Sequence, residues 1–123
     1  MDLKTSAETF TLDRLLRLWP EPSQLRGAVL FGSRARENGD EIPEESDWDI
    51  GIIYEGPLPL METPDCWDLF LWEKEHWERG FVLQLELARN SLILHDPDQI
   101  ISERFQFLKD KILPHYVRYL RRI

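Results

Sequence analysis

Two short apolar runs, each bounded by a polar motif, constrain the fold of this chain more than any other feature. The first run, residues 28–31, ends at Gly32, and the second, residues 50–54, follows Asp47 and Asp49. Apolar runs of this length, bounded by polar residues, are typical of buried strands. The pattern therefore predicts two strands of one sheet, over residues 28–31 and 48–54, with polar groups gathered where the first strand ends and the second begins.

These polar groups have the chemistry of a phosphate and metal site. Gly32 has no Cβ, so a phosphate can approach its backbone closely. Ser33 offers a hydroxyl at the start of a predicted short helix, whose free N–H groups attract anions. Asp47 and Asp49 are separated by one residue, and strand side chains alternate, so both carboxylates point to one side. Two carboxylates beside a phosphate cradle predict a site for a divalent metal ion and a nucleotide.

Together the two motifs resemble the signature of the DNA polymerase β-like nucleotidyltransferase superfamily, and especially its small prokaryotic branch, the minimal nucleotidyltransferases (MNT). The two motifs in this order, each at a strand end, are more specific than a lone Gly-Ser or Asp-x-Asp. The resemblance implies a single α/β domain over residues 1–123, with a small mixed sheet and helices packed on one face. It covers residues 28–94, and its motifs are Gly32-Ser33, Arg34-Ala35-Arg36 and Ser46-Asp47-Trp48-Asp49.

The resemblance also implies roles for individual residues. Gly32 and Ser33 would hold the β- and γ-phosphates of a nucleoside triphosphate, with ATP as the expected substrate. Arg34 and Arg36 would either reach phosphate or lie on the surface of the short helix. The structural alternative for Gly32 and Ser33 is a tight turn with a helix cap. Where the family often has glycine after the Arg-Ala-Arg, this chain has Glu37.

Asp47 and Asp49 would bind Mg²⁺ by the same resemblance, although aspartates at a strand start are also commonly solvated. A third metal-binding, catalytic carboxylate is expected on a neighbouring strand, and Asp68 is the choice. It lies within residues 66–72, a predicted apolar strand where an unpaired carboxylate would be costly and a metal ion would compensate. The structural alternative for Asp68 is a hydrogen-bonded or edge-exposed aspartate. The rival is Glu86. Residues 81–88 alternate like a strand, but the resemblance favours a helix, in which Glu86 would face water.

Periodicity and capping signals predict the remaining elements. Apolar side chains at helical spacing predict a first helix that begins near Thr5 and ends at Pro20. Asp96 followed by Pro97 predicts the start of a last helix, which Pro114 should kink or break. Between these two helices, the expected elements are a short helix over residues 73–80 and a strand over residues 91–95.

Composition narrows the class of protein. The chain has 123 residues, which suits one compact domain. Its formal net charge of −8 is poorly suited to gripping a polyanion, so no nucleic-acid partner is expected. Cys66 is the only cysteine, which excludes an intrachain disulfide. No apolar stretch approaches membrane length and no signal peptide is visible, so a cytoplasmic protein without membrane contact is expected.

The resemblance implies a magnesium-dependent nucleotidyltransferase that moves AMP, or another nucleoside monophosphate, to a hydroxyl. It also implies that the acceptor is a tyrosine of a helical HEPN-type toxin, which this chain would AMPylate as the antitoxin of the pair. The chain is too short to carry the extra helical domain that holds the acceptor in related enzymes, so a partner would complete the site. The prediction leaves homo- and hetero-oligomers open. The alternative is a binding module that kept the fold, lost turnover and neutralises its partner by complex formation.

Overall fold

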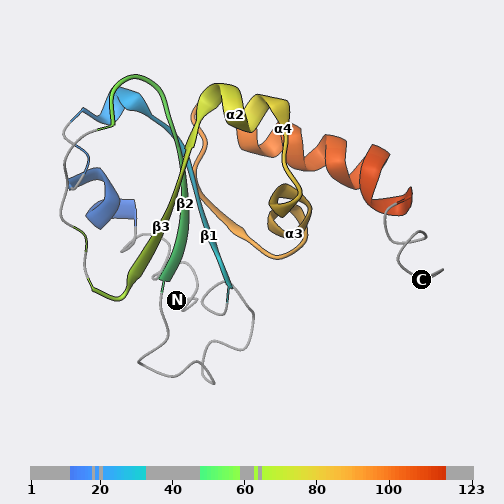
Figure 1. Ribbon diagram of the computed structural model, residues 1–123, viewed down its shortest axis with the longest axis horizontal. Coiled ribbons are helices and arrows are strands. Elements are labelled where there is room, and N and C mark those ends of the chain that lie inside the picture. The colour runs from blue at the N-terminus through green and yellow to red at the C-terminus, as the bar shows by residue number, and fades with distance from the viewer. Residues whose placement is uncertain are drawn as a thin grey trace.

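The computed structural model describes residues 12–17, 19, 21–32, 48–58, 63 and 65–115. Within these residues, four strands form one mixed sheet in the order β3-β2-β1-β4 (Figure 1). The β1–β2 and β1–β4 pairs are antiparallel, and the β2–β3 pair is parallel. The predicted α/β class and mixed sheet are therefore confirmed. The strands are β1 (Leu25–Phe31), β2 (Trp48–Tyr54), β3 (Trp67–Glu73) and β4 (Leu92–His95).

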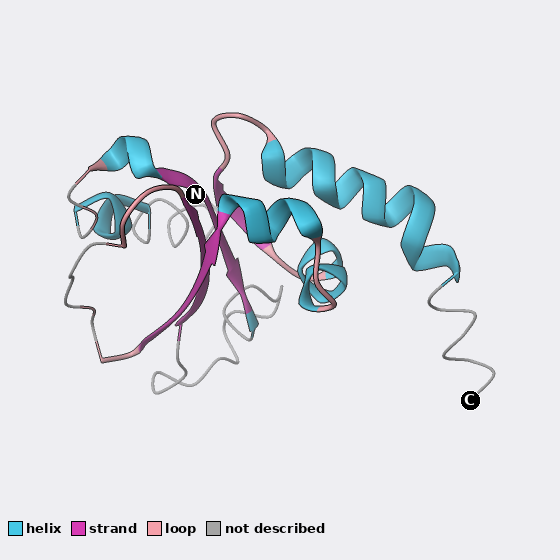
Figure 2. Cartoon of the chain, turned by 45° about the horizontal axis from the view of Figure 1, so that its top comes forward, coloured by secondary structure: helices cyan, strands magenta, loops and turns pink. Residues whose placement is uncertain are grey.

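Both faces of the sheet are covered, as Figure 2 shows. On one face, Leu15 and Trp19 pack with Ile50 and Ile52 of β2. On the other, Ile53 packs with side chains from α2, α3 and α4. The prediction placed helices on one face, which holds for α2 to α4, while the helical segment 12–17 covers the opposite face. These three helices are α2 (Lys74–Arg79), α3 (Leu83–Arg89) and α4 (Ile100–Phe107).

The stretch around Glu86, which alternates like a strand, forms helix α3, as the family resemblance implied. Its packing explains this choice, because the helix buries Leu87 completely and Gln84 almost completely. The amide Nε2 of Gln84 donates a hydrogen bond of 2.9 Å to the carbonyl oxygen of Trp77, at the end of α2. Tertiary burial and one buried hydrogen bond therefore override the alternating pattern.

The last helix begins later than predicted. Gln99 adopts a left-handed conformation with φ 60°, so α4 begins at Ile100 rather than at Pro97. Asp96 still acts as the cap. Its Oδ1 accepts a hydrogen bond of 3.1 Å from the Ile101 N–H, and its Oδ2 accepts one of 2.9 Å from the Ser102 N–H. The capping residue was predicted correctly, and the start of the helix was wrong by three residues.

Pro114 does not break the helix. The chain continues from α4 into a π-helical turn, η4 (Leu108–Ile112), and is helical again at residues 113–115. Proline lacks the N–H for a helical hydrogen bond, and its ring clashes with the carbonyl four residues earlier. A wider turn directly before Pro114 accommodates both defects. Among the helices of the described residues, none is long and apolar enough to cross a membrane.

The cap at Asp96 yields a stability prediction. Asp96→Ala leaves two backbone N–H groups of α4 without a side-chain acceptor, and we expect the free energy of unfolding to fall by about 1–2 kcal/mol. Asp98→Ala is the matched control, because Asp98 makes only an exposed ion pair, 3.4 Å from Arg26, worth about 0–1 kcal/mol. Urea denaturation measures both. An equal loss in the two variants would show that the cap contributes no more than a surface ion pair.

Candidate active site

The predicted site residues that the structure describes meet at one end of the sheet, where β1 ends and β2 and β3 begin (Figure 1). The Cα partner of Asp49 is Phe31 on β1 and Asp68 on β3. Neighbouring strands lie about 4.8 Å apart, and residues in register point to the same face. The side chains of Phe31, Asp49 and Asp68 therefore form one row across the sheet.

Gly32, which directly follows this row, lies against the carboxylate of Asp49. Its φ is +72°, a conformation that favours glycine. A Cβ placed on Gly32 would lie 2.1 Å from Oδ2 of Asp49 and 3.1 Å from its Cγ. The sequence suggested that a phosphate needs the space at Gly32. The structure shows that the carboxylate of Asp49 lies where a Cβ would be, so the missing side chain of Gly32 makes room for this carboxylate.

Asp68 is adjacent to Asp49, as predicted, but it is not buried. β3 is an edge strand of the sheet, and the side chain of Asp68 is exposed. Of the two alternatives for Asp68, the structure shows the edge-exposed one, because the edge position leaves the carboxylate in solvent and burial imposes no cost there. What places Asp68 in the candidate site is its register with Asp49.

Glu86, the rival for the third carboxylate, projects from α3. It is exposed, and its Oε1 accepts a hydrogen bond of 2.9 Å from Nδ2 of Asn90, one helical turn later. Its place on a helix surface agrees with the expectation that a helical Glu86 would face water. The strand register therefore favours Asp68 as the partner of Asp49.

Four of the predicted site residues, Ser33, Arg34, Arg36 and Asp47, lie outside the described residues. Within residues that are described, no three His, Cys, Asp or Glu side chains lie close enough to hold a metal ion together. Asp49 and Asp68 still supply two carboxylates from neighbouring strands. Carboxylate oxygens are the ligands that Mg²⁺ prefers, so the described half of the site fits this ion.

Two aromatic side chains that the sequence analysis did not single out border the carboxylates. The ring of Phe31 lies 5.0 Å from the ring of Phe70, measured between centroids. Phe70 follows Asp68 by two residues on β3, so it lies on the same face as both carboxylates. That two-residue spacing is the signal in the sequence that places Phe70 on the same face as Asp68.

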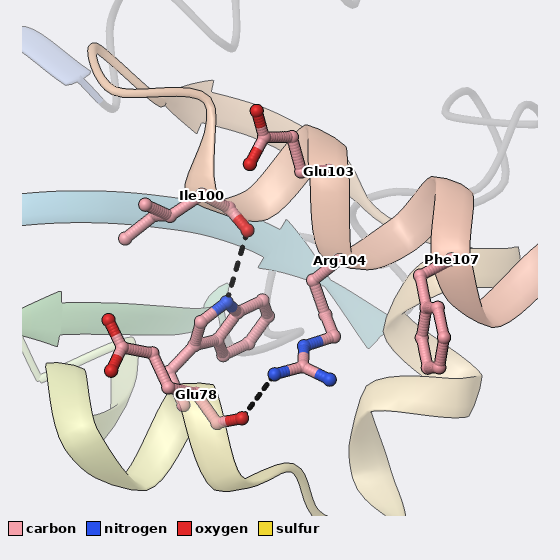
Figure 3. A pocket seen from close by; sticks show the side chains of 6 residues that line it. Glu78, Ile100, Glu103, Arg104 and Phe107 are labelled. Carbon is pink, nitrogen blue, oxygen red and sulfur yellow. Dashed lines mark hydrogen bonds between the residues drawn. The ribbon is translucent and has the colours of Figure 1, made fainter.

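Two hollows that described residues line lie away from the carboxylate row. Figure 3 shows a groove of about 320 Å³ between α2 and α4, where Nε1 of Trp77 donates a hydrogen bond of 3.3 Å to the carbonyl of Ile100. The guanidinium of Arg104 donates to the carbonyl of Glu78 beside it. A second, polar hollow of about 500 Å³ lies around Tyr54 and Lys74. Neither hollow is lined by the carboxylate row.

Comparison with solved structures identifies the fold. One similar structure is a chain of the toxin–antitoxin MntA–HpeT, in a mutant with two aspartate-to-glutamate substitutions. Its TM-score is 0.51 at 16% identity, over 93% of this chain and 92% of that chain. The complex of tri-AMPylated HEPN toxin with MNT antitoxin from Shewanella oneidensis has a TM-score of 0.49 at 16% identity, over 93% of this chain and 92% of that chain. A toxin–antitoxin structure with AMP-PNP has a TM-score of 0.49 at 14% identity, over 94% of each chain.

No protein-family model matches the chain, and no curated protein matches it. At such low identity, the structural likeness to MntA–HpeT shows a shared fold and does not transfer an activity. The chain therefore has the fold of the MNT nucleotidyltransferases, and the resemblance inferred from its motifs is confirmed at that level.

The contact between Gly32 and Asp49 yields a second stability prediction. Gly32→Ala should lower the free energy of unfolding by more than about 2 kcal/mol, because alanine must adopt a positive φ and the carboxylate of Asp49 must move. In an Asp49→Ala background, the same change should cost only about 1 kcal/mol, the conformational part. A double-mutant cycle by chemical denaturation measures the difference. Equal costs in both backgrounds would show that the carboxylate does not occupy this space in solution.

Proposed function

We propose that this chain is a magnesium-dependent nucleotidyltransferase that moves AMP, or another nucleoside monophosphate, from a nucleoside triphosphate to a hydroxyl of a partner protein. One observation carries the proposal. The carboxylate of Asp49 lies against the backbone of Gly32, and Asp68 stands beside it in register on the next strand. This row lies at a sheet end in a chain with the MNT fold, which supports assigning the carboxylates to chemistry.

In this proposal Asp49 and Asp68, together with Asp47, hold Mg²⁺. When bound, the ion would supply positive charge that neutralises the triphosphate and the negative charge on the phosphate oxygens in the transition state. Gly32 and Ser33 hold the β- and γ-phosphates. Arg34 and Arg36 reach toward the same phosphates.

At the α-phosphorus, the reaction makes one bond and breaks one. The acceptor oxygen bonds to the α-phosphorus, and the bond from that phosphorus to the oxygen bridging the α- and β-phosphates breaks. Pyrophosphate leaves with the bonding electrons. The proton of the acceptor hydroxyl passes to the exposed carboxylate of Asp68, which acts as general base.

The acceptor that we propose is a HEPN-type toxin. The MntA–HpeT structure is a toxin–antitoxin assembly with the same fold, which supports a protein partner. The net charge of −8 also favours a protein acceptor over a nucleic acid. An antitoxin that transfers AMP to its toxin would inactivate it covalently, whereas an inactive domain would need to remain bound.

Nucleotide binding gives the first functional prediction. Mg²⁺ and ATP together should raise the melting temperature of the wild type by several degrees, because ligands that bind only the folded state stabilise it by mass action. Asp49→Asn should lose most of this shift. Glu86→Gln is the control and should keep it, since Glu86 lies on the surface of α3. Equal shifts in wild type and Asp49→Asn, measured by thermal unfolding, would remove Asp49 from the metal site.

Transfer itself tests Asp68. With α-labelled ATP, Mg²⁺ and a HEPN-type toxin, Asp68→Asn should lower label transfer by at least about 100-fold, the usual effect of losing a general base. The fold should remain intact, because Asp68 is exposed on an edge strand. Glu86→Gln should transfer normally.

The opposite result, an inactive Glu86→Gln and an active Asp68→Asn, would show that the third carboxylate is misassigned. If the wild type transfers no label but binds the toxin and blocks it, the binding-module alternative replaces the enzyme.

A further inference from the structure

Helix α4 carries two stripes of side chains. The stripe that packs against the sheet is buried and continues into η4, and it consists of Ile101, Phe105 and Leu108. A second stripe recurs at intervals of three and four residues, so it follows another side of the helix. It consists of Ile100, Glu103, Arg104 and Phe107. This second stripe forms one wall of the groove in Figure 3, and α2 forms the other.

The core of this chain does not account for the apolar side chains of the second stripe. A helix packed against a sheet needs one apolar side. Phe107 is nevertheless 48% exposed at one end of the groove. Trp77 of α2 lines the groove but is only 1% exposed, and its N–H already donates to the carbonyl of Ile100. The groove therefore presents an apolar surface that makes no polar demand on an occupant.

The cation in the groove is used within the chain. The guanidinium of Arg104 donates a hydrogen bond to the carbonyl of Glu78, in the last turn of α2, and its Cζ lies 6.0 Å from the ring centroid of Phe107. Basic side chains near the C-terminal end of a helix satisfy carbonyls that lack an intrahelical partner. Arg104 therefore joins α2 to α4 and holds the two walls of the groove in place.

The rim of the groove is acidic. Glu103 is exposed, and within the part of the chain that the structure describes its carboxylate makes no ion pair or hydrogen bond. The carboxylate of Glu78 lies 3.7 Å from Nζ of Lys74, on its own helix, and its side chain is 58% exposed. An ion pair so exposed contributes little. Both carboxylates can therefore receive a positive charge from outside the chain.

This combination of an apolar groove and an acidic rim selects one kind of occupant. The whole chain has a net charge of −8, of the same sign as the rim. Nucleic acids and anionic membranes would be repelled, and a second copy of the chain carries the same charge. A basic protein segment is attracted by both. A groove of about 320 Å³ between two helices suits the side chains of a third helix.

We propose that the groove between α2 and α4 docks a basic, amphipathic helix of a partner protein. An aliphatic side chain of that helix packs against Phe107, and a lysine or arginine about one turn away pairs with Glu103. The inference rests on the proposed function for the partner, which is the toxin. It adds a docking surface apart from the carboxylate row, so that affinity for the partner and transfer depend on different residues.

Binding without nucleotide tests the proposal. A HEPN-type toxin is titrated by calorimetry into the full chain in the absence of Mg²⁺ and ATP. Phe107→Ala should weaken binding by at least about tenfold, as for a central apolar anchor. Glu103→Lys should weaken it by at least about fivefold, and more at low salt than at high salt, because the pair is electrostatic. Both variants should keep the thermal shift given by Mg²⁺ and ATP.

Each substitution has a matched control. Ile93→Ala removes an apolar side chain that is 37% exposed on β4, and Glu86→Lys reverses an exposed carboxylate on α3. Both controls should bind the toxin like the wild type. All four positions are exposed, so every variant should fold, and thermal unfolding without ligands checks this.

Three results would overturn the proposal: a wild type that does not bind the toxin, unchanged binding in Phe107→Ala and Glu103→Lys, or equal losses in the controls. Self-association of the wild type that Phe107→Ala abolishes, measured by sedimentation, would also overturn it, because the groove would then hold a second copy. Failure of the enzymatic proposal has a different signature. The toxin would still bind through Phe107 and Glu103 but would receive no label from ATP.

Discussion

The central strand β2 pairs along its length with a neighbour on each side, and the candidate site depends on the register of both pairs. β1 runs antiparallel to it and places Phe31 opposite Asp49, while β3 runs parallel and places Asp68 opposite the same residue. A slip of one residue in either pair would turn the neighbouring strand over and move its side chain to the other face. The two core clusters prevent such a slip, because the inner strands bury apolar side chains on both faces.

The sequence was most informative where apolar runs and polar boundaries coincide. β2 was predicted with its observed bounds, 48–54, because Asp49 and Tyr54 bracket a run of apolar residues and glycine. β1 was predicted to begin at Ala28 but begins at Leu25. Arg26 interrupts the apolar pattern at the start of β1. Its Nε lies 2.8 Å from Oε1 of Glu55, just beyond the end of β2. Only the paired strand reveals why a charged residue is tolerated there.

The sequence predicted that Asp68 lies next to Asp49, but it did not decide how exposed Asp68 is. That Asp68 lies beside Asp49 followed from chain order, since consecutive strands are commonly neighbours. Whether it lies in solvent stayed open between a buried and an edge-exposed carboxylate, because the order β3-β2-β1-β4 makes β3 an edge strand and a local pattern does not determine sheet order. The exposure of Phe70 depends on the same sheet order, since an apolar strand at an edge can leave one side chain of its inner face partly uncovered.

The aromatic side chains of the sheet face have a consequence for observing this protein. Trp72 lies over Gly51, where a Cβ would be 2.4 Å from its ring, and its ring neighbours are Phe70 toward the carboxylates and Trp77 toward the helices. An indole so placed is an intrinsic optical reporter. Its emission depends on the polarity around it, so binding at this end of the sheet should change the share that Trp72 contributes to the fluorescence of the five tryptophans.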